Sequence, residues 1–243
     1  MGQPLSSSAI RERARELLGG QWLKSALVLF MASVFIALPV IVIDLIWHDE
    51  DMTRFAQGTV TLLVGCVFRH GLAGYFLAIA RGQSPAAESV FAGLKVYPQC
   101  FVLFFYYNLF ISCWTLLLAV PGIIKMHSYA LTFYIRQDRP YISGEGRGTG
   151  AITASRQMMD GSKARLFFLY LSFAGWAALL FVWVYLLSFA SALLHKFLLL
   201  PDAAVQIVSI ALLLLPLYCL AAYIETSAAV FYESLRTRRT APE

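Results

Sequence analysis

Three ionisable residues interrupt long apolar stretches of this sequence: Arg69, His70 and Glu225. Arg69 and His70 lie near the middle of an apolar run at residues 57–80, and Glu225 follows the last run. A charge that faces lipid costs about 2.5–3.5 kcal/mol, so ionisable groups at membrane depth are functional candidates. They could line a path for protons or a substrate, or Arg69 and Glu225 could form a structural ion pair, which we favour. Counted from the inner ends of the runs, their depths differ by roughly 6 Å, which an arginine can bridge.

A second polar group surrounds Pro121 and Gly122, which interrupt apolar sequence. Proline cannot continue a helical hydrogen-bond ladder and glycine permits a reversal, so the pair predicts a tight turn that breaks a helix. Lys125 and His127 follow closely and, with His70, are candidates for a polar lining. A buried turn whose polar groups are satisfied explains Lys125 and His127 as well.

The sequence offers little to catalysis or metal binding. It contains no H-E-x-x-H, no G-x-S-x-G and no paired carboxylates within an apolar run. The HDED run at residues 48–51 reads as a solvated loop, because adjacent side chains rarely converge on one ion. The glycine-rich residues 143–150 could hold a phosphate, but they lack the closing Gly-Lys-Ser/Thr of a P-loop, which favours a hinge. We therefore expect no enzyme activity, no cofactor and no metal.

The composition is that of a membrane protein. Of the 243 residues, 59% are hydrophobic and only 14% are charged, and the mean hydropathy is +0.69. Soluble domains carry about 25% charged residues. The sequence pI of 9.1 needs no nucleic acid as a partner, because basic loops on the cytoplasmic side explain it. The four cysteines all lie in apolar runs, so we expect free thiols.

Charge decides the number of crossings. Five apolar runs alone would place the basic loop 136–165 opposite the basic N-terminus, against the positive-inside rule. If residues 123–136 cross back after Pro121, fifteen of the 19 Lys and Arg residues lie inside, three lie outside, and Arg69 lies within a span. The sequence therefore predicts an all-α, polytopic bundle of six transmembrane helices. The five evident runs are residues 25–43, 57–80, 96–124, 166–194 and 203–224.

Amphipathic segments flank these spans. Residues 1–20 predict a cytoplasmic helix with Ser8 as its cap, either lying on the membrane surface or solvated. Two interfacial helices are expected between spans, and residues 21–235 form the membrane domain, with a basic tail at 236–243. The run 166–194 would be about 43 Å long as one helix, against a hydrocarbon core of about 30 Å, so a tilt or a bend at residues 188–191 is expected. The apolar faces of the interfacial helices carry Val90, Phe91 and Leu94 in the first and Ile152, Ser155, Met158 and Met159 in the second.

Several motifs carry a family resemblance over nearly the whole chain. They are RARELLGGQW near the start, ARGQ at residues 80–83, PGIIK at 121–125, SRQMMDG at 155–161 with LSFAGW, and FYESL at 231–235. Together they resemble the bacterial integral membrane proteins grouped as domain of unknown function nine-seven-five. The plan is also similar to the membrane domain of some glycerophosphodiester phosphodiesterases, although the chain has no soluble catalytic domain to match.

The resemblance implies a multi-pass protein of the bacterial cytoplasmic membrane. The distribution of basic residues predicts that both termini lie in the cytoplasm. It implies no activity. We expect a non-catalytic scaffold or lipid-interacting component whose partners are membrane lipids and not nucleic acid. A small transporter with a polar site at Arg69, His70 and Glu225 is the alternative, and a lipid-acting enzyme is a third.

Overall fold

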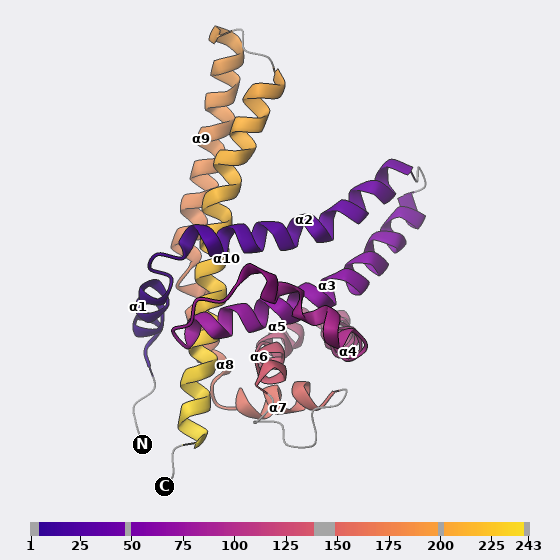
Figure 1. Cartoon of the computed structure of the whole chain (residues 1–243), viewed down its shortest axis with the longest axis vertical. Coiled ribbons are helices and arrows are strands. Elements are labelled where there is room, and N and C mark those ends of the chain that lie inside the picture. Colours follow the sequence, from indigo (N-terminus) through magenta and orange to yellow (C-terminus); the bar gives the residue numbers. More distant parts are fainter. Residues whose placement is uncertain (1–4, 47–49, 139–148, 199–201, 241–243) are drawn as a thin grey trace.

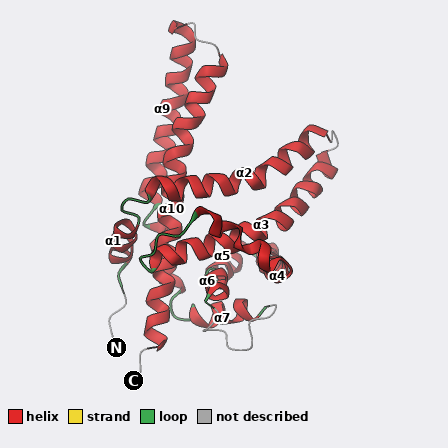
Figure 2. Cartoon of the chain, in the orientation of Figure 1, coloured by secondary structure: helices red, strands yellow, loops and turns green. Residues whose placement is uncertain are grey.

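The computed structural model describes residues 5–46, 50–138, 149–198 and 202–240. Throughout that part of the chain the regular elements are helices, and none is a strand, which confirms the all-α prediction (Figure 1, Figure 2). The helices are α1 (Ser7–Leu17), α2 (Trp22–Ile46), α3 (Glu50–Ala80), the 3-10 helix η1 (Ala87–Val96), α4 (Tyr97–Leu117), α5 (Ala119–Tyr129), α6 (Thr132–Gln137), α7 (Gly150–Met158), α8 (Lys163–Leu171), α9 (Ala174–Leu198) and α10 (Asp202–Thr240).

Five segments within the described residues are long and apolar enough to cross a membrane. The predicted fourth crossing at residues 123–136 is divided between α5, of 11 residues, and α6, of six. Neither is long enough to span a bilayer alone, because a helix needs about 20 residues. The count of six crossings is therefore not confirmed. The five segments are Trp22–Ile46, Glu50–Ala80, Ala87–Leu117, Lys163–Leu193 and Ser209–Arg238.

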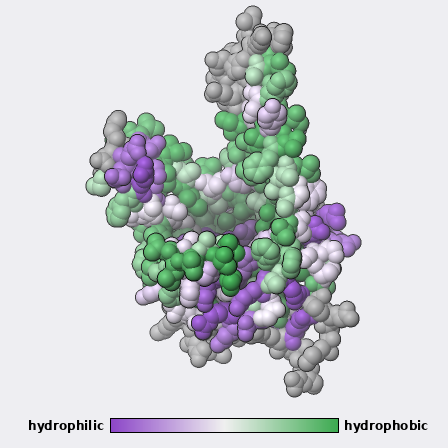
Figure 3. Space-filling view, turned by 180° about the vertical axis from the view of Figure 1, so that it is seen from behind, coloured by the Kyte–Doolittle hydropathy of each residue, from purple (hydrophilic) through white to green (hydrophobic). Residues whose placement is uncertain are grey.

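Large apolar side chains cover much of the surface. Leu116 on α4 is 92% exposed and Phe181 on α9 is 77% exposed. Seen from behind, hydrophobic surface covers much of the centre and of the vertical arm, and hydrophilic surface gathers in the lower part and at the end of the arm on the left (Figure 3). Such continuous apolar surface is costly in water, and its extent supports a membrane environment.

The buried core lies where α3, α6 and α10 meet. The α2–α3 and α9–α10 hairpins diverge from this region, and their far ends extend away from the rest of the chain (Figure 1). Tyr75 and Phe76 from α3, Tyr134 from α6, and Phe231 and Tyr232 from α10 are among the largest fully buried side chains. Aromatic packing at this junction therefore holds the two hairpins together.

Helix α1 is part of this core. Its predicted apolar face is buried at Ile10 and Ala14, and Leu18 just beyond its end is buried too. The Tyr223 hydroxyl of α10 donates to the Arg11 carbonyl at 3.0 Å. The apolar face is thus covered by protein, so the prediction that it faces lipid is wrong. The N-cap is Ser6, whose hydroxyl accepts from the Ala9 amide at 3.2 Å, and not Ser8.

The run at residues 166–194 is interrupted near its start. Helix α8 ends at Leu171, α9 begins at Ala174, and α9 continues without a break through Ser188 and Ser191. Residues 188–191 therefore contain no helix break, and the alternative of a tilted helix stays a prediction. The Arg11 guanidinium donates to the Ser172 carbonyl at 3.3 Å, so α1 stabilises the interruption where the sequence placed none.

Candidate functional site

A cavity of about 300 Å³ lies among α3, α4, α5, α6, α8 and α10. Small-molecule pockets in proteins generally enclose about 300–1,000 Å³, so this one is small but sufficient for a polar group. Apolar residues make up the rest of its wall. Its polar lining consists of Arg69, Tyr107, His127, Tyr134, Tyr170 and Glu225.

Arg69 and Glu225 form the predicted pair at the wall of this cavity. The Arg69 Nη1 atom lies 2.9 Å from Glu225 Oε1, and the Tyr134 hydroxyl donates to Glu225 Oε2 at 3.0 Å. The Arg69 guanidinium also lies 5.4 Å from the Phe133 ring centroid, within reach of a cation–π contact. Both side chains stay partly accessible, at 32% for Arg69 and 26% for Glu225. The ion pair is therefore formed, but neither of its side chains is fully buried.

His127 is the third predicted residue that lines the cavity. Its Nδ1 donates to the Ile123 carbonyl at 2.8 Å, one helical turn back along α5. The imidazole also packs against the Tyr170 ring, with centroids 5.9 Å apart. This bond turns Nδ1 towards the backbone and gives the ring a defined orientation beside Tyr170.

His70 and Lys125 lie apart from this lining. His70 is buried within α3, and its carbonyl accepts from the Gln137 side-chain amide at 2.6 Å. Lys125 places its Nζ 4.4 Å from the Trp114 ring centroid, on the side of α5 next to α4. Neither residue borders the cavity that contains Arg69 and Glu225. The predicted polar lining therefore included two residues, His70 and Lys125, that do not line the cavity.

The helix break near Pro121 and Gly122 lies a few residues earlier than predicted. Leu118 is extended, with φ −162° and ψ 140°, and α5 begins directly after it. Pro121 lies in the first turn of α5, where a missing amide costs no helical hydrogen bond. A Cβ on Gly122 would lie 2.7 Å from Thr115 Oγ1, so the glycine permits close packing of α5 on α4.

A second break, between α5 and α6, shapes the cavity directly. It falls at Ala130 and Leu131. The buried Ser155 of α7 donates its hydroxyl to the Ser128 carbonyl at 2.9 Å and accepts from the Leu131 amide at 3.2 Å. Irregular backbone within a membrane bundle must be satisfied by protein groups, and here one hydroxyl satisfies two. Ser155 thereby positions the two short helices that carry His127 and Tyr134.

Residues 140–239 match the model of a protein family described as "Protein of unknown function (DUF975)". The resemblance is confirmed over this part of the chain, which is narrower than the span expected from the motifs. No curated protein and no solved structure matches the chain. The DUF975 match includes Ser155, Tyr170 and Glu225, whereas Arg69 and Tyr134 lie outside it.

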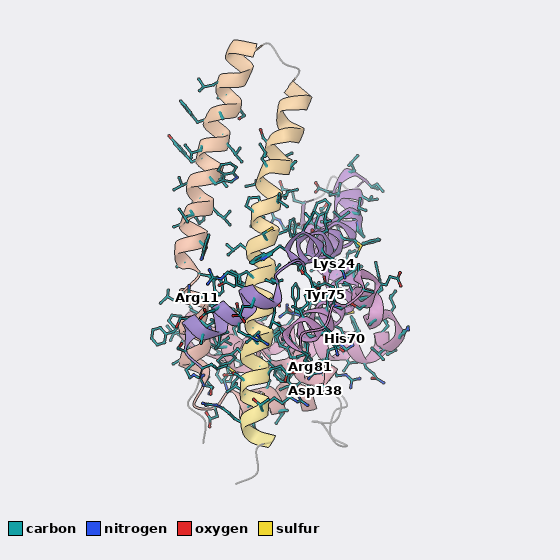
Figure 4. The ribbon with its side chains drawn as sticks, turned by 60° about the vertical axis from the view of Figure 1, so that its left-hand side comes forward. Arg11, Lys24, His70, Tyr75, Arg81 and Asp138 are labelled. Atoms are coloured by element: carbon teal, nitrogen blue, oxygen red, sulfur yellow. The ribbon has the colours of Figure 1, made fainter. Side chains whose placement is uncertain are left out.

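A closed ring of charges, which the sequence analysis missed, joins two residues outside the DUF975 match to two residues near its end. Asp138 Oδ2 lies 3.0 Å from Arg81 Nη2 and 2.6 Å from Arg236 Nε. Glu233 accepts from the same two arginines, at 2.6 Å from Arg81 and 3.1 Å from Arg236. The Tyr232 hydroxyl adds a bond to Asp138 at 3.1 Å. Figure 4 shows Arg81 and Asp138 together beside the lower part of α10.

Two of the family motifs provide this ring. In ARGQ, Gly82 has a φ of 77°, and the amides of Gly82 and Gln83 donate to the carbonyls of Ile79 and Ala78. This Schellman-type end stops α3 at the point where Arg81 can turn towards α10. In FYESL, at residues 231–235, Tyr232 and Glu233 contribute the partners from α10. The charged residues within and next to these two motifs were the sequence signal that could have predicted the ring.

Proposed function

We propose that this protein is a non-catalytic, lipid-binding component of the bacterial cytoplasmic membrane. The observation that carries the proposal is the polar cavity of about 300 Å³ at Arg69 and Glu225. A lipid offers the matching combination of a polar group and apolar chains, whereas a water-soluble ligand would have to cross apolar surface to reach the site.

The surroundings of the cavity support this choice. Met126, which lines it, is 45% exposed on α5. The neighbouring Ile123 and Ile124 of α5 and Phe167 of α8 are exposed as well. Large apolar side chains at the entrance favour contact with acyl chains.

The proposed topology has six crossings and cytoplasmic termini, with α5 and α6 together as the fourth crossing. The fifteen-to-three distribution of basic residues supports it. Single cysteines at Arg156 and Arg54, in a background without the native cysteines, can be labelled with an impermeant thiol reagent in intact cells. We expect labelling at position 54 and none at 156, and the reverse pattern would overturn the topology.

Lipid analysis of the protein in native-membrane nanodiscs tests lipid binding. We expect one lipid species to be enriched over the bulk membrane. Ala228 lines the cavity, so Ala228→Leu should reduce that enrichment several-fold. Ala211→Leu introduces the same side chain at an exposed position of α10 and is the matched control. A lipid profile identical to the bulk membrane in all three proteins would exclude specific lipid binding.

Transport is the second candidate, and the break between α5 and α6 beside the cavity favours it. Broken helices beside a polar site at membrane depth are typical of secondary transporters. The predicted transport site included His70, which does not line the cavity. Solute flux into proteoliposomes that is lost in Ala228→Leu and retained in Ala211→Leu would establish transport over static binding.

A further inference from the structure

We infer that the cavity binds a phosphate-bearing group, which on the proposed lipid-binding function is a phospholipid headgroup. The inference rests on that function for the source of the phosphate and on hydrogen-bond chemistry for its class. Within the described part of the chain, the cavity is lined by several hydrogen-bond donors of Arg69 and two tyrosines that bond to no described residue.

Arg69 provides most of these donors. A guanidinium carries five N–H groups in a planar fork, and the bond to Glu225 Oε1 comes from Nη1. No other hydrogen bond of the Arg69 side chain forms with a described residue, so Nε and Nη2 remain available. A planar fork matches two phosphate oxygens and binds them in parallel.

Two tyrosines add hydroxyl groups on other walls. Tyr107 of α4 and Tyr170 of α8 both line the cavity. Their rings pack against Phe133 and His127 respectively. Neither hydroxyl is hydrogen-bonded to a described residue, in contrast to the hydroxyl of Tyr134, which donates to Glu225. Arg69 and the two tyrosine hydroxyls therefore come from three separate helices that surround one cavity.

Each oxygen of the Glu225 carboxylate already has a protein partner. Glu225 Oε1 is engaged by Arg69 and Oε2 by Tyr134. A cationic ligand at the carboxylate would lie next to the Arg69 guanidinium, which repels it. A phosphate can use Arg69 and the two tyrosines without breaking the pair, because Arg69 neutralises Glu225 and keeps donors to spare. The unused donors of Arg69 and a carboxylate that Arg69 neutralises together favour an anionic, acceptor-rich ligand.

The test measures lipid retention by native mass spectrometry of the full-length protein. Phosphatidylglycerol and diacylglycerol with identical acyl chains are offered to the delipidated protein, so that the pair differs at the headgroup. We expect a preference of about tenfold for the phospholipid, equivalent to one good hydrogen bond to a charged group. Inorganic phosphate and glycerol 3-phosphate are included as soluble competitors.

The variants Tyr107→Phe and Tyr170→Phe remove the hydroxyls and keep the rings, so folding should be preserved. Combined, they should reduce the phospholipid preference several-fold, and the part that Arg69 contributes should remain. Tyr106→Phe, on the same helix as Tyr107, and Tyr185→Phe, an exposed residue of α9, are the matched controls and should leave the preference unchanged.

The outcomes separate the inference from the proposed function. Equal retention of both lipids, or a preference unchanged in the double variant, overturns the phosphate inference and leaves lipid binding intact. Failure of the wild-type protein to retain either lipid overturns the proposed function. Displacement of phospholipid by millimolar glycerol 3-phosphate or inorganic phosphate supports the phosphate chemistry and assigns it to a soluble ligand.

Discussion

Among the described residues, two clusters of ion pairs connect helix α10 to other helices. They differ in how many of their charged groups have all their partners within the cluster. In the ring, Asp138 and Glu233 each contact both Arg81 and Arg236, and Asp138 is 5% exposed. The ring joins the end of α3 and the residue after α6 to α10. Each charged side chain of the ring therefore has two oppositely charged partners within the ring.

The pair of Arg69 and Glu225 has one bond between two charges and a cavity beside it. Two stacked tyrosines connect the groups: the rings of Tyr134 and Tyr232 lie 5.8 Å apart, and their hydroxyls donate to Glu225 and Asp138 respectively. A fully satisfied network fixes structure, whereas a partly satisfied one keeps hydrogen-bonding capacity for a ligand. The comparison therefore assigns a structural role to the ring and a ligand-binding role to the pair.

Breaking the ring should have the largest effect. Asp138→Asn removes the charge that Arg81 and Arg236 share, and should lower the free energy of unfolding by about 3 kcal/mol. The measurement is the midpoint of thermal unfolding in detergent. Lipid retention by the protein that remains folded should be preserved, because the cavity is lined by other residues.

The matched control for Asp138→Asn is Glu50→Gln. Glu50 pairs with Arg54 at 2.7 Å near the start of α3, but its side chain is 82% exposed. A solvent-exposed pair of this kind contributes little, so the loss should stay below about 0.5 kcal/mol. Similar losses in both variants would contradict the structural role of the ring.

Breaking the pair should cost less. Arg69→Ala and Glu225→Ala should each lower the free energy of unfolding by about 2 kcal/mol, because both side chains keep partial access to the cavity. The double variant should lose about 1 kcal/mol less than the sum of the single losses. Thermal unfolding of all four proteins in one detergent measures the coupling. Strict additivity would show that the two residues are not energetically paired.

The sequence predicted the pair because Arg69 lies in α3 and Glu225 in α10, and both helices are uninterrupted at these positions. Counting residues along a regular helix then gives depth correctly. The ring was missed because Asp138 follows α6, and its position depends on the break at Ala130 and Leu131. No local residue pattern marks that break, since Ser155 satisfies it from another helix.

The position of the Pro121 break had a similar cause. Proline was expected to end a helix, but it is equally suited to the first turn of the next one. The extended residue is Leu118, whose type gives no local indication of a break. Packing against Thr115 at Gly122 fixes the start of α5, and such a tertiary contact cannot be read from the adjacent sequence.

Ser155 stabilises the backbone between α5 and α6, the two helices that carry His127 and Tyr134. Ser155→Ala removes both bonds across the break between α5 and α6 and should cost about 1–2 kcal/mol, since two buried backbone groups lose a partner. Thr153→Ala, at an exposed position of α7, is the matched control. Because His127 and Tyr134 flank the break, Ser155→Ala should also reduce lipid retention. Lower stability with unchanged retention would show that the break does not shape the site.

Lys125 extends the comparison to a charge with no acidic partner among the described residues. Its ammonium lies 4.4 Å from the Trp114 ring centroid, and such a contact contributes about 0.5–1 kcal/mol when partly exposed. Lys125→Met keeps a long apolar chain over the ring, so the stability loss should be at most about 1 kcal/mol. Trp114→Leu tests the same contact from the other side. If the contact accounts for the effect, adding Lys125→Met to Trp114→Leu should cause almost no further loss. A loss as large as that of Glu225→Ala would instead mean that Lys125 is a third ionic anchor.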